Sequence, residues 1–130
     1  MSTSPLCNYC NAYNETVEHL FWECEIVQDF LGSFDQLLCQ HSINLNYNKE
    51  QFIFGFYKNY KLTKVNNIIL LNIKYYIYKC KMQNVKLSNI ALLNNLKYIY
   101  KVEQRISINK ETQCDFEKDW KPWATLLTKQ

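Results

Sequence analysis

Four residues near the amino end have the types and the spacing of a metal-binding site: Cys7, Cys10, His19 and Cys24. A pair of cysteines two residues apart can wrap a tight turn around one side of a metal ion. His19 and Cys24 supply a second pair, with four residues between them, at the start of a predicted helix. Three thiolates and one imidazole form the closed tetrahedral set that is typical of structural Zn²⁺. We therefore predict a structural zinc site, which would order an amino end that has too little apolar sequence to fold alone.

The chain contains six cysteines in all, and it shows no basic and apolar regions of a secretory signal at its amino end. This favours thiolates on a metal, in a reducing compartment, over disulfides. The three other cysteines lie among apolar residues, and we expect each to be a buried free thiol: Cys39, Cys80 and Cys114. His41 and the nearby Cys39 form a rival pair of possible metal ligands, but this pair lacks the second pair that a four-ligand site needs.

The sequence offers no arrangement of residues typical of catalysis. A chain with two glycines has no Gly-rich phosphate loop, and no Cys/His or Ser/His/Asp arrangement remains once His19 is assigned to zinc. The acids between Glu15 and Glu25 have the pattern of a solvated helix face. We predict no catalytic residue, no small-molecule substrate and no enzymatic activity of the isolated chain.

Length and composition predict one all-α domain. The chain has 130 residues, 48% of them apolar, with 2 Gly and 2 Pro, which fits a folded chain rich in regular elements. No strand-like alternation of any length occurs. No apolar window is long enough to span a bilayer, and so we expect a soluble, intracellular protein without a membrane partner.

The elements that must position the zinc ligands follow from helical periodicity and capping residues. Thr16 can cap the first helix, Gly32 is a weak point in it, Ser88 can cap the third, and Pro122 bends or restarts the last. The predicted elements within the single domain 1–130 are a zinc knuckle (1–24), a first helix (16–41), a short aromatic helix (49–57), a long antiparallel basic hairpin (64–110, with its helices over 64–84 and from 88) and a short last helix (115–127).

The two faces of the predicted second helix both carry apolar side chains. One face is expected in the core and holds Val65, Ile69, Ile73, Tyr76, Ile77 and Cys80. The other carries Ile68, Leu71, Tyr75, Tyr78 and Met82 among lysines. We therefore expect this helix to be packed on more than one side. In the third helix the predicted apolar seam is Leu92, Leu96, Ile99, Val102 and Ile106.

Charge is distributed unevenly along the chain. Residues 1–48 contain six acids and no Lys or Arg, whereas residues 49–110 contain twelve basic residues against two acids, a net +10. A basic segment of this size favours a polyanionic partner, most often RNA or DNA. The predicted nucleic-acid contacts are Lys74, Lys79, Lys81, Lys86, Lys97, Lys101 and Arg105, with Trp22 as an exposed aromatic beside the zinc site.

Two alternatives stay open for these residues. The lysines either bind phosphates or merely solvate a helix face. Four tyrosines among the charges either stack on unpaired bases or belong to the core: Tyr75, Tyr78, Tyr98 and Tyr100. Phe21, next to Trp22, is expected in the core.

The residues also resemble a known family. Cys7 and Cys10 followed by ETVEHLFWEC (15–24) resemble the zinc-binding segment at the carboxyl end of LINE-type, non-LTR retrotransposon reverse transcriptases. The likeness continues through FIFGF (52–56), NIILLNIKYYIYKCK (67–81), VEQRISINK (102–110) and FEKDWKPW (116–123). It implies that Cys7, Cys10, His19 and Cys24 are the family's CCHC zinc ligands, with a loop longer than that of the similar retroviral nucleocapsid knuckles.

The resemblance further implies a role in gripping template RNA or target DNA during target-primed reverse transcription, in the nucleus or a cytoplasmic ribonucleoprotein. The chain lacks the paired aspartates of the polymerase and an endonuclease domain, and so it would be at most the tail of such an enzyme. The alternative is a zinc-stabilised protein–protein interaction module without nucleic-acid binding. Its acidic first helix would then dock on the basic hairpin or on another domain of the parent reverse transcriptase.

Overall fold

The computed structural model describes residues 6, 7, 9–11, 14–43, 45, 47–54 and 60–128. This part of the chain is mostly helical and contains no strand, so the all-α prediction is confirmed. The elements are the π-helix η1 (His19–Glu23) and the α-helices α1 (Glu25–Gln40), α2 (Lys49–Phe54), α3 (Tyr60–Gln83), α4 (Asn89–Asn109) and α5 (Gln113–Thr128).

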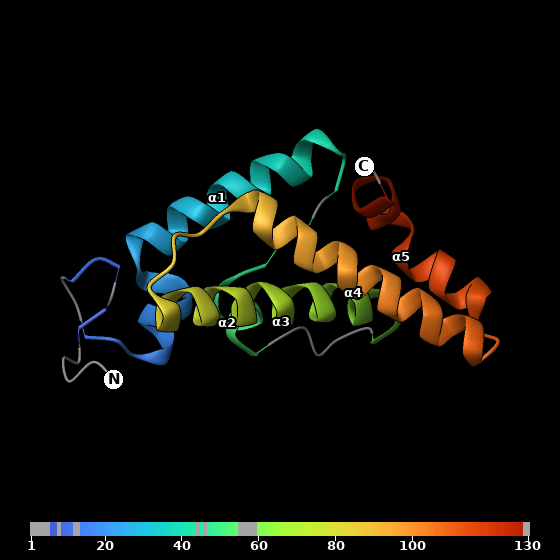
Figure 1. The fold of residues 1–130 in the computed structure, drawn as a ribbon, viewed down its shortest axis with the longest axis horizontal. Coiled ribbons are helices and arrows are strands. Elements are labelled where there is room, and N and C mark those ends of the chain that lie inside the picture. The colour runs from blue at the N-terminus through green and yellow to red at the C-terminus, as the bar shows by residue number, and fades with distance from the viewer. Residues whose placement is uncertain are drawn as a thin grey trace.

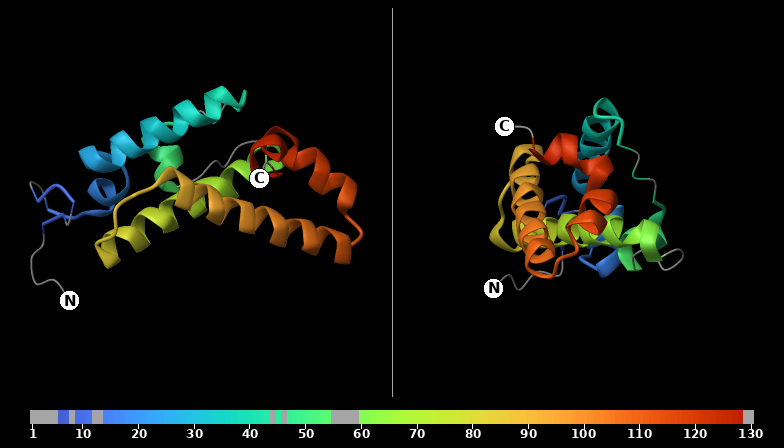
Figure 2. Two further views of the ribbon diagram at one scale, coloured as in Figure 1. Left: turned by 45° about the horizontal axis from the view of Figure 1, so that its top comes forward. Right: turned by 90° about the vertical axis from the view of Figure 1, so that its right-hand side faces the viewer.

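The helices form an elongated molecule with the amino-terminal loop at one end of its long axis and α5 towards the other (Figure 1). α1 lies along one edge and α3 along the opposite edge in this view. The helices α3 and α4 run in broadly opposite directions and cross at a wide angle, as Figure 2 also shows. Within the described residues, no helix has the length and apolar character needed to cross a membrane.

The first helix differs from the prediction because it is broken at Cys24, where the backbone is extended. α1 then continues through Gly32 without interruption, so the expected weak point does not break the helix. It ends where Ser42 adopts a left-handed conformation (φ 58°) and the N–H of Ile43 donates to the carbonyl of Leu38 at 2.9 Å. Ile43 is buried, which gives this helix end the apolar contact typical of such a cap.

The short helix α2 begins with a reciprocal cap. The side chain of Asn48 accepts a hydrogen bond from the N–H of Gln51 at 2.8 Å, and the side chain of Gln51 accepts one from the N–H of Asn48 at 3.0 Å. Two backbone donors that a helix start leaves free are thereby satisfied. The carboxyl end of the predicted helix, beyond Phe54, lies outside the described residues.

The core face of α3 is as predicted. All six of its expected members are buried: Val65, Ile69, Ile73, Tyr76, Ile77 and Cys80. On the opposite face Ile68 packs on the core as expected, but four residues are not packed and are between 46% and 66% exposed: Leu71, Tyr75, Tyr78 and Met82. We call these four residues the α3 stripe.

Ser88 caps α4, as expected, by accepting a hydrogen bond from the N–H of Ala91 at 3.4 Å. The buried seam of α4 is rotated from the predicted one: Leu92 and Leu96 are buried, but Tyr100 and Ser107 follow them instead of Val102 and Ile106. The rotation has a physical cause in α5. The ring of Tyr100 packs against Phe116 at 5.1 Å and against Trp120 at 5.6 Å between ring centroids.

α5 is longer than the predicted last helix and continues through Pro122. Proline cannot donate to the carbonyl four residues earlier, which commonly bends a helix, and Figure 1 shows α5 changing direction. Of the three cysteines expected to be buried free thiols, Cys80 is buried. Cys39 and Cys114 are exposed, so the prediction was wrong for these two, whose helices α1 and α5 turn them to solvent.

Candidate metal centre

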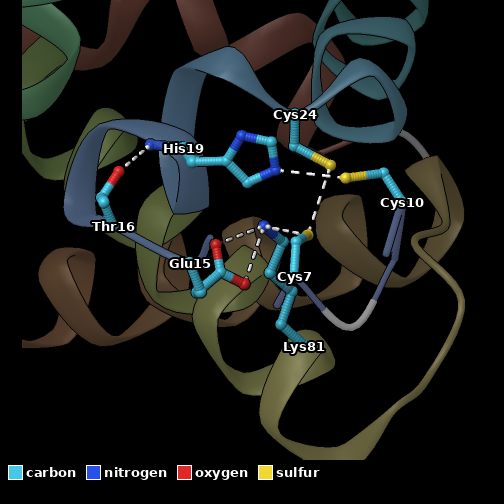
Figure 3. A network of polar contacts seen from close by, with 7 residues as sticks. All are labelled: Cys7, Cys10, Glu15, Thr16, His19, Cys24 and Lys81. Atoms are coloured by element: carbon cyan, nitrogen blue, oxygen red, sulfur yellow. Dashed lines mark hydrogen bonds and ion pairs between the residues drawn. The ribbon is translucent and has the colours of Figure 1, made fainter. Parts of the chain in front are cut away.

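The structure brings Cys7, Cys10, His19 and Cys24 together into a group that could hold a metal ion, which we call the Cys/His cluster. Their nearest ligand atoms all lie within 4.8 Å of one another, although 17 positions separate the outermost pair in sequence. Cys7, His19 and Cys24 are buried and Cys10 is half-buried. Figure 3 shows the three sulfurs and the imidazole pointing toward one another.

The separations within the cluster fit a tetrahedral zinc site. Zn–S bonds of about 2.3 Å at tetrahedral angles place two sulfurs about 3.8 Å apart, and a sulfur and an imidazole nitrogen slightly closer. The Sγ atoms of Cys7 and Cys24 are 3.7 Å apart, and Cys10 Sγ is 3.3 Å from His19 Nε2. The donor set therefore suits a soft, four-coordinate cation, and Nε2 is the imidazole atom that faces it.

A short turn positions the first pair of ligands. The N–H of Asn11 donates to the carbonyl of Cys7 at 2.9 Å, and Asn11 takes a left-handed conformation (φ 54°), which asparagine tolerates better than most residues. A β-bridge between Leu6 and Asn14 closes the loop around this turn. The loop thus presents Cys7 and Cys10 from one side, as the C-x2-C spacing predicts.

A π-turn positions the second pair. In an α-helix five residues turn through about 500°, which leaves side chains 19 and 24 about 140° apart. In η1 the N–H of Cys24 instead donates to the carbonyl of His19 at 3.2 Å, five residues earlier in the chain. This wider π-turn brings Cys24 back to the same side of the helix as His19. Thr16 supports the start of this turn, because its hydroxyl accepts a hydrogen bond from the N–H of His19 at 3.1 Å. The break in the predicted first helix therefore lies where the ligand geometry requires it.

Burial affects the protonation of the thiols in the cluster. Burial raises the pKa of the Cys24 thiol, although the backbone N–H groups of Val27 and Ile26 and the charge of Lys81 lower it in part. A bound divalent cation would instead lower the pKa of the thiol, because a thiol that coordinates such a cation is deprotonated outright.

Lys81 is not an exposed phosphate contact, which corrects that prediction. Its side chain is 2% exposed, and its Nζ lies 3.2 Å from a carboxylate oxygen of Glu15 and 3.4 Å from Cys7 Sγ. Glu15 was expected on a solvated helix face and is instead mostly buried in this ion pair. Sequence separations of 66 and 74 residues give no local signal for either contact.

Trp22 is less exposed than predicted. Its ring is half-buried and lies 5.7 Å from that of Phe52 and 6.1 Å from that of Tyr47, between centroids. Its carbonyl oxygen accepts a hydrogen bond from the side chain of Gln28. The indole therefore packs the segment that carries His19 and Cys24 against α2, and it is not the fully exposed aromatic that was predicted. Phe21, as expected, packs on the core.

The remaining predicted basic contacts differ in exposure. Lys79, Lys86, Lys101 and Arg105 are exposed, whereas Lys74 and Lys97 are half-buried. Lys74 donates to the carbonyl of Ile53 at 2.7 Å, and partial burial lowers its pKa. Between described residues, the ion pairs use Lys49 and Lys81. The charges of Lys101 and Arg105 therefore face solvent.

The four tyrosines divide between the two alternatives. Tyr100 is buried and belongs to the core, whereas Tyr75, Tyr78 and Tyr98 are exposed. Phe21, Tyr75 and Tyr78 border a hollow of about 310 Å³ between η1 and α3, together with Leu71 and Lys74. Exposed aromatic rings beside lysines thus occur on α3 and α4.

Comparison with known proteins gives no assignment: no family model, no curated protein and no solved structure matches the chain.

Proposed function

We propose that this chain is a zinc-stabilised, non-catalytic nucleic-acid-binding domain, similar to the C-terminal region of LINE-type reverse transcriptases. In that setting it would grip template RNA or target DNA during target-primed reverse transcription. The observation that carries the proposal is the convergence of four ligand atoms within 4.8 Å at the amino end. Three sulfurs and one nitrogen use all four positions of a tetrahedral ion, and so the metal has a structural role.

The nucleic-acid part of the proposal is supported by the exposed cations of α3, α4 and the segment that connects them. Lys101 and Arg105 are one helical turn apart on α4, and Lys79 and Lys86 lie towards the connection between the helices. Such a surface binds phosphates by releasing counterions, which gives affinity without base specificity and a steep dependence on salt. Tyr98, exposed next to Lys97, is placed to add base stacking on unpaired strands.

The proposal is tested in two steps on the purified chain. Metal analysis should find close to one zinc per chain, and removal by a chelator should melt the amino end. Fluorescence anisotropy with a single-stranded RNA and a duplex DNA of equal length should then show binding that weakens steeply as salt rises. A chain without zinc would overturn the metal assignment, and a zinc-loaded chain that binds neither probe at low salt would overturn the nucleic-acid assignment.

The alternative function, a protein interaction module, is favoured by the α3 stripe. Its members recur at intervals of four and three residues, which is the spacing of a seam that packs against another helix. Lys74 and Lys79 flank the stripe, so the matching partner is an amphipathic helix with acidic residues beside its apolar face. Two copies of the stripe would bring like charges together, which disfavours self-association.

The double variant Leu71→Ser with Met82→Ser separates the two functions, because both side chains are exposed and neither is basic. Unchanged RNA affinity in this variant supports binding through the basic residues. If the wild-type chain binds no nucleic acid, the stripe becomes the better candidate interface.

A further inference from the structure

A buried lysine links the Cys/His cluster to the far half of the chain. Lys81 lies near the carboxyl end of α3, and Figure 3 shows its ammonium between the carboxylate of Glu15 and the sulfur of Cys7. Its Nζ is 3.4 Å from Cys7 Sγ, and 3.2 and 3.3 Å from the two oxygens of Glu15. The same atom lies 5.5 Å from the centre of the Tyr9 ring. These three neighbours come from the segment between Cys7 and Glu15, which carries the first pair of cysteines.

The charges of these groups explain why a lysine can be buried here. Three thiolates and a neutral imidazole around a divalent cation carry a net charge of −1, counted from the ligand set. An ammonium beside one of the thiolates offsets that charge, and a buried ammonium without such partners would be strongly destabilising. Glu15 accepts further hydrogen bonds from the ammonium and thereby fixes where it points. An N–H donor to a metal-bound sulfur also orients the ligand, as outer partners of metal sites commonly do.

We propose that Lys81 is a positioning residue of the metal centre: it holds the Cys7 thiolate in place and makes metal affinity depend on the docking of α3. The inference rests on the zinc site of the proposed function and goes beyond it, because it assigns a determinant of affinity outside the four ligands. A second contact strengthens the same junction, since the hydroxyl of Tyr9 donates to the carbonyl of Val85 at 2.7 Å, just beyond the end of α3. The loop thus contacts α3 at Lys81 and the chain just beyond α3 at Val85.

The test compares Lys81→Met with Lys79→Met in the full chain. Methionine keeps much of the apolar stem of lysine and removes the charge. Lys79 is two positions earlier on the same helix and exposed, so it is the matched control. Zinc affinity is measured by competition with a chromophoric chelator. We expect Lys81→Met to weaken zinc binding by roughly 10- to 100-fold, which is typical when an outer partner of a metal ligand is lost, and Lys79→Met to leave it unchanged.

A spectroscopic measurement separates positioning from a general loss of stability. In the cobalt-substituted protein, the thiolate-to-metal charge-transfer band should shift in Lys81→Met, because Cys7 has lost its hydrogen-bond donor. The band should stay unchanged in Lys79→Met. Zinc affinity within about twofold of wild type, together with an unshifted band, would overturn the proposal.

A measurement on the wild-type chain covers the case in which Lys81→Met does not fold. Nuclear magnetic resonance should detect the Lys81 ammonium as a slowly exchanging group in the zinc-loaded protein and lose it after chelation. Rapid exchange in the zinc-loaded protein would count against the contact. A wild-type chain that binds no zinc would instead remove the zinc site itself, so the two failures are distinguishable.

Discussion

Tyr76 and Ser88 close the connection between α3 and α4 by exchanging two hydrogen bonds. The N–H of Ser88 donates to the phenol oxygen of Tyr76 at 2.8 Å, and the phenol O–H donates to the carbonyl of Ser88 at 3.2 Å. Ser88 is also the N-cap of α4. One tyrosine of α3 therefore fixes the residue at which the next helix begins.

Tyr76→Phe should lower the free energy of unfolding by about 1 kcal/mol, because it removes this pair of hydrogen bonds to a residue that water can reach. The contact of the ring with Phe30, at 5.8 Å between centroids, is kept. Urea unfolding of the zinc-loaded protein measures the loss. Tyr75→Phe is the control, since Tyr75 is exposed, and an equal effect of the two variants would contradict the assignment.

Cys10→Ser should remove most of the bound zinc and lower the Tm by roughly 10 °C or more, because metal binding contributes folding free energy directly. Metal analysis and a thermal melt measure both effects on the same sample. Cys39→Ser is the matched control, since Cys39 is exposed and outside the Cys/His cluster. Full zinc content in Cys10→Ser would exclude Cys10 as a ligand.

Lys101→Ala combined with Arg105→Ala should weaken RNA binding without changing helix content in circular dichroism. Two lost phosphate contacts should reduce the slope of log affinity against log salt by about 1.4 for a single strand. Lys118→Ala with Lys121→Ala removes the same charge from exposed positions of α5 and is the control. If both double variants change affinity equally, net charge rather than position governs binding.

Asp35→Asn should stabilise the protein at neutral pH. Burial raises the pKa of Asp35, and the hydrogen bond from the hydroxyl of Tyr47, at 3.5 Å, lowers it in part. The pKa of Asp35 is therefore higher in the folded protein than in the unfolded chain. Its carboxyl contributes to the free energy of unfolding at pH values below the pKa of the unfolded chain, and this contribution is lost as the pH rises through the pKa of the folded protein. The gain from Asp35→Asn in urea unfolding should therefore be larger at pH 7 than at about pH 3. The exposed Asp29→Asn is the control, and a gain independent of pH would contradict the assignment.

The sequence was sufficient to predict features that depend on local spacing. The convergence of Cys7, Cys10, His19 and Cys24 follows from two short pairs, and the core face of α3 follows from helical periodicity. Ser88 as a cap depends only on its neighbours in the chain. In each case the interaction spans a few residues, or joins residue types that one metal ion would select as ligands.

The features that were missed depend on which helix packs where. Lys81 resembles the other lysines of α3 in sequence, and it is buried where it meets Glu15 and Cys7 of the amino-terminal segment. Tyr98 and Tyr100 are two positions apart, yet α5 covers one of them and not the other. Trp22 is half-buried because its ring packs against the ring of Phe52. The break at Cys24 was missed because helical periodicity does not register one inserted π-turn.

Among the described residues, three helices are followed by a left-handed residue that is not glycine. Ser42 follows α1, Asn84 follows α3 and Glu111 follows α4, with φ between 54° and 58°. A side chain other than asparagine costs on the order of 1 kcal/mol in this conformation. The joints at Ser42 and Glu111 therefore carry backbone strain that glycine would relieve, so the Tm of the fold can be raised at positions outside the Cys/His cluster.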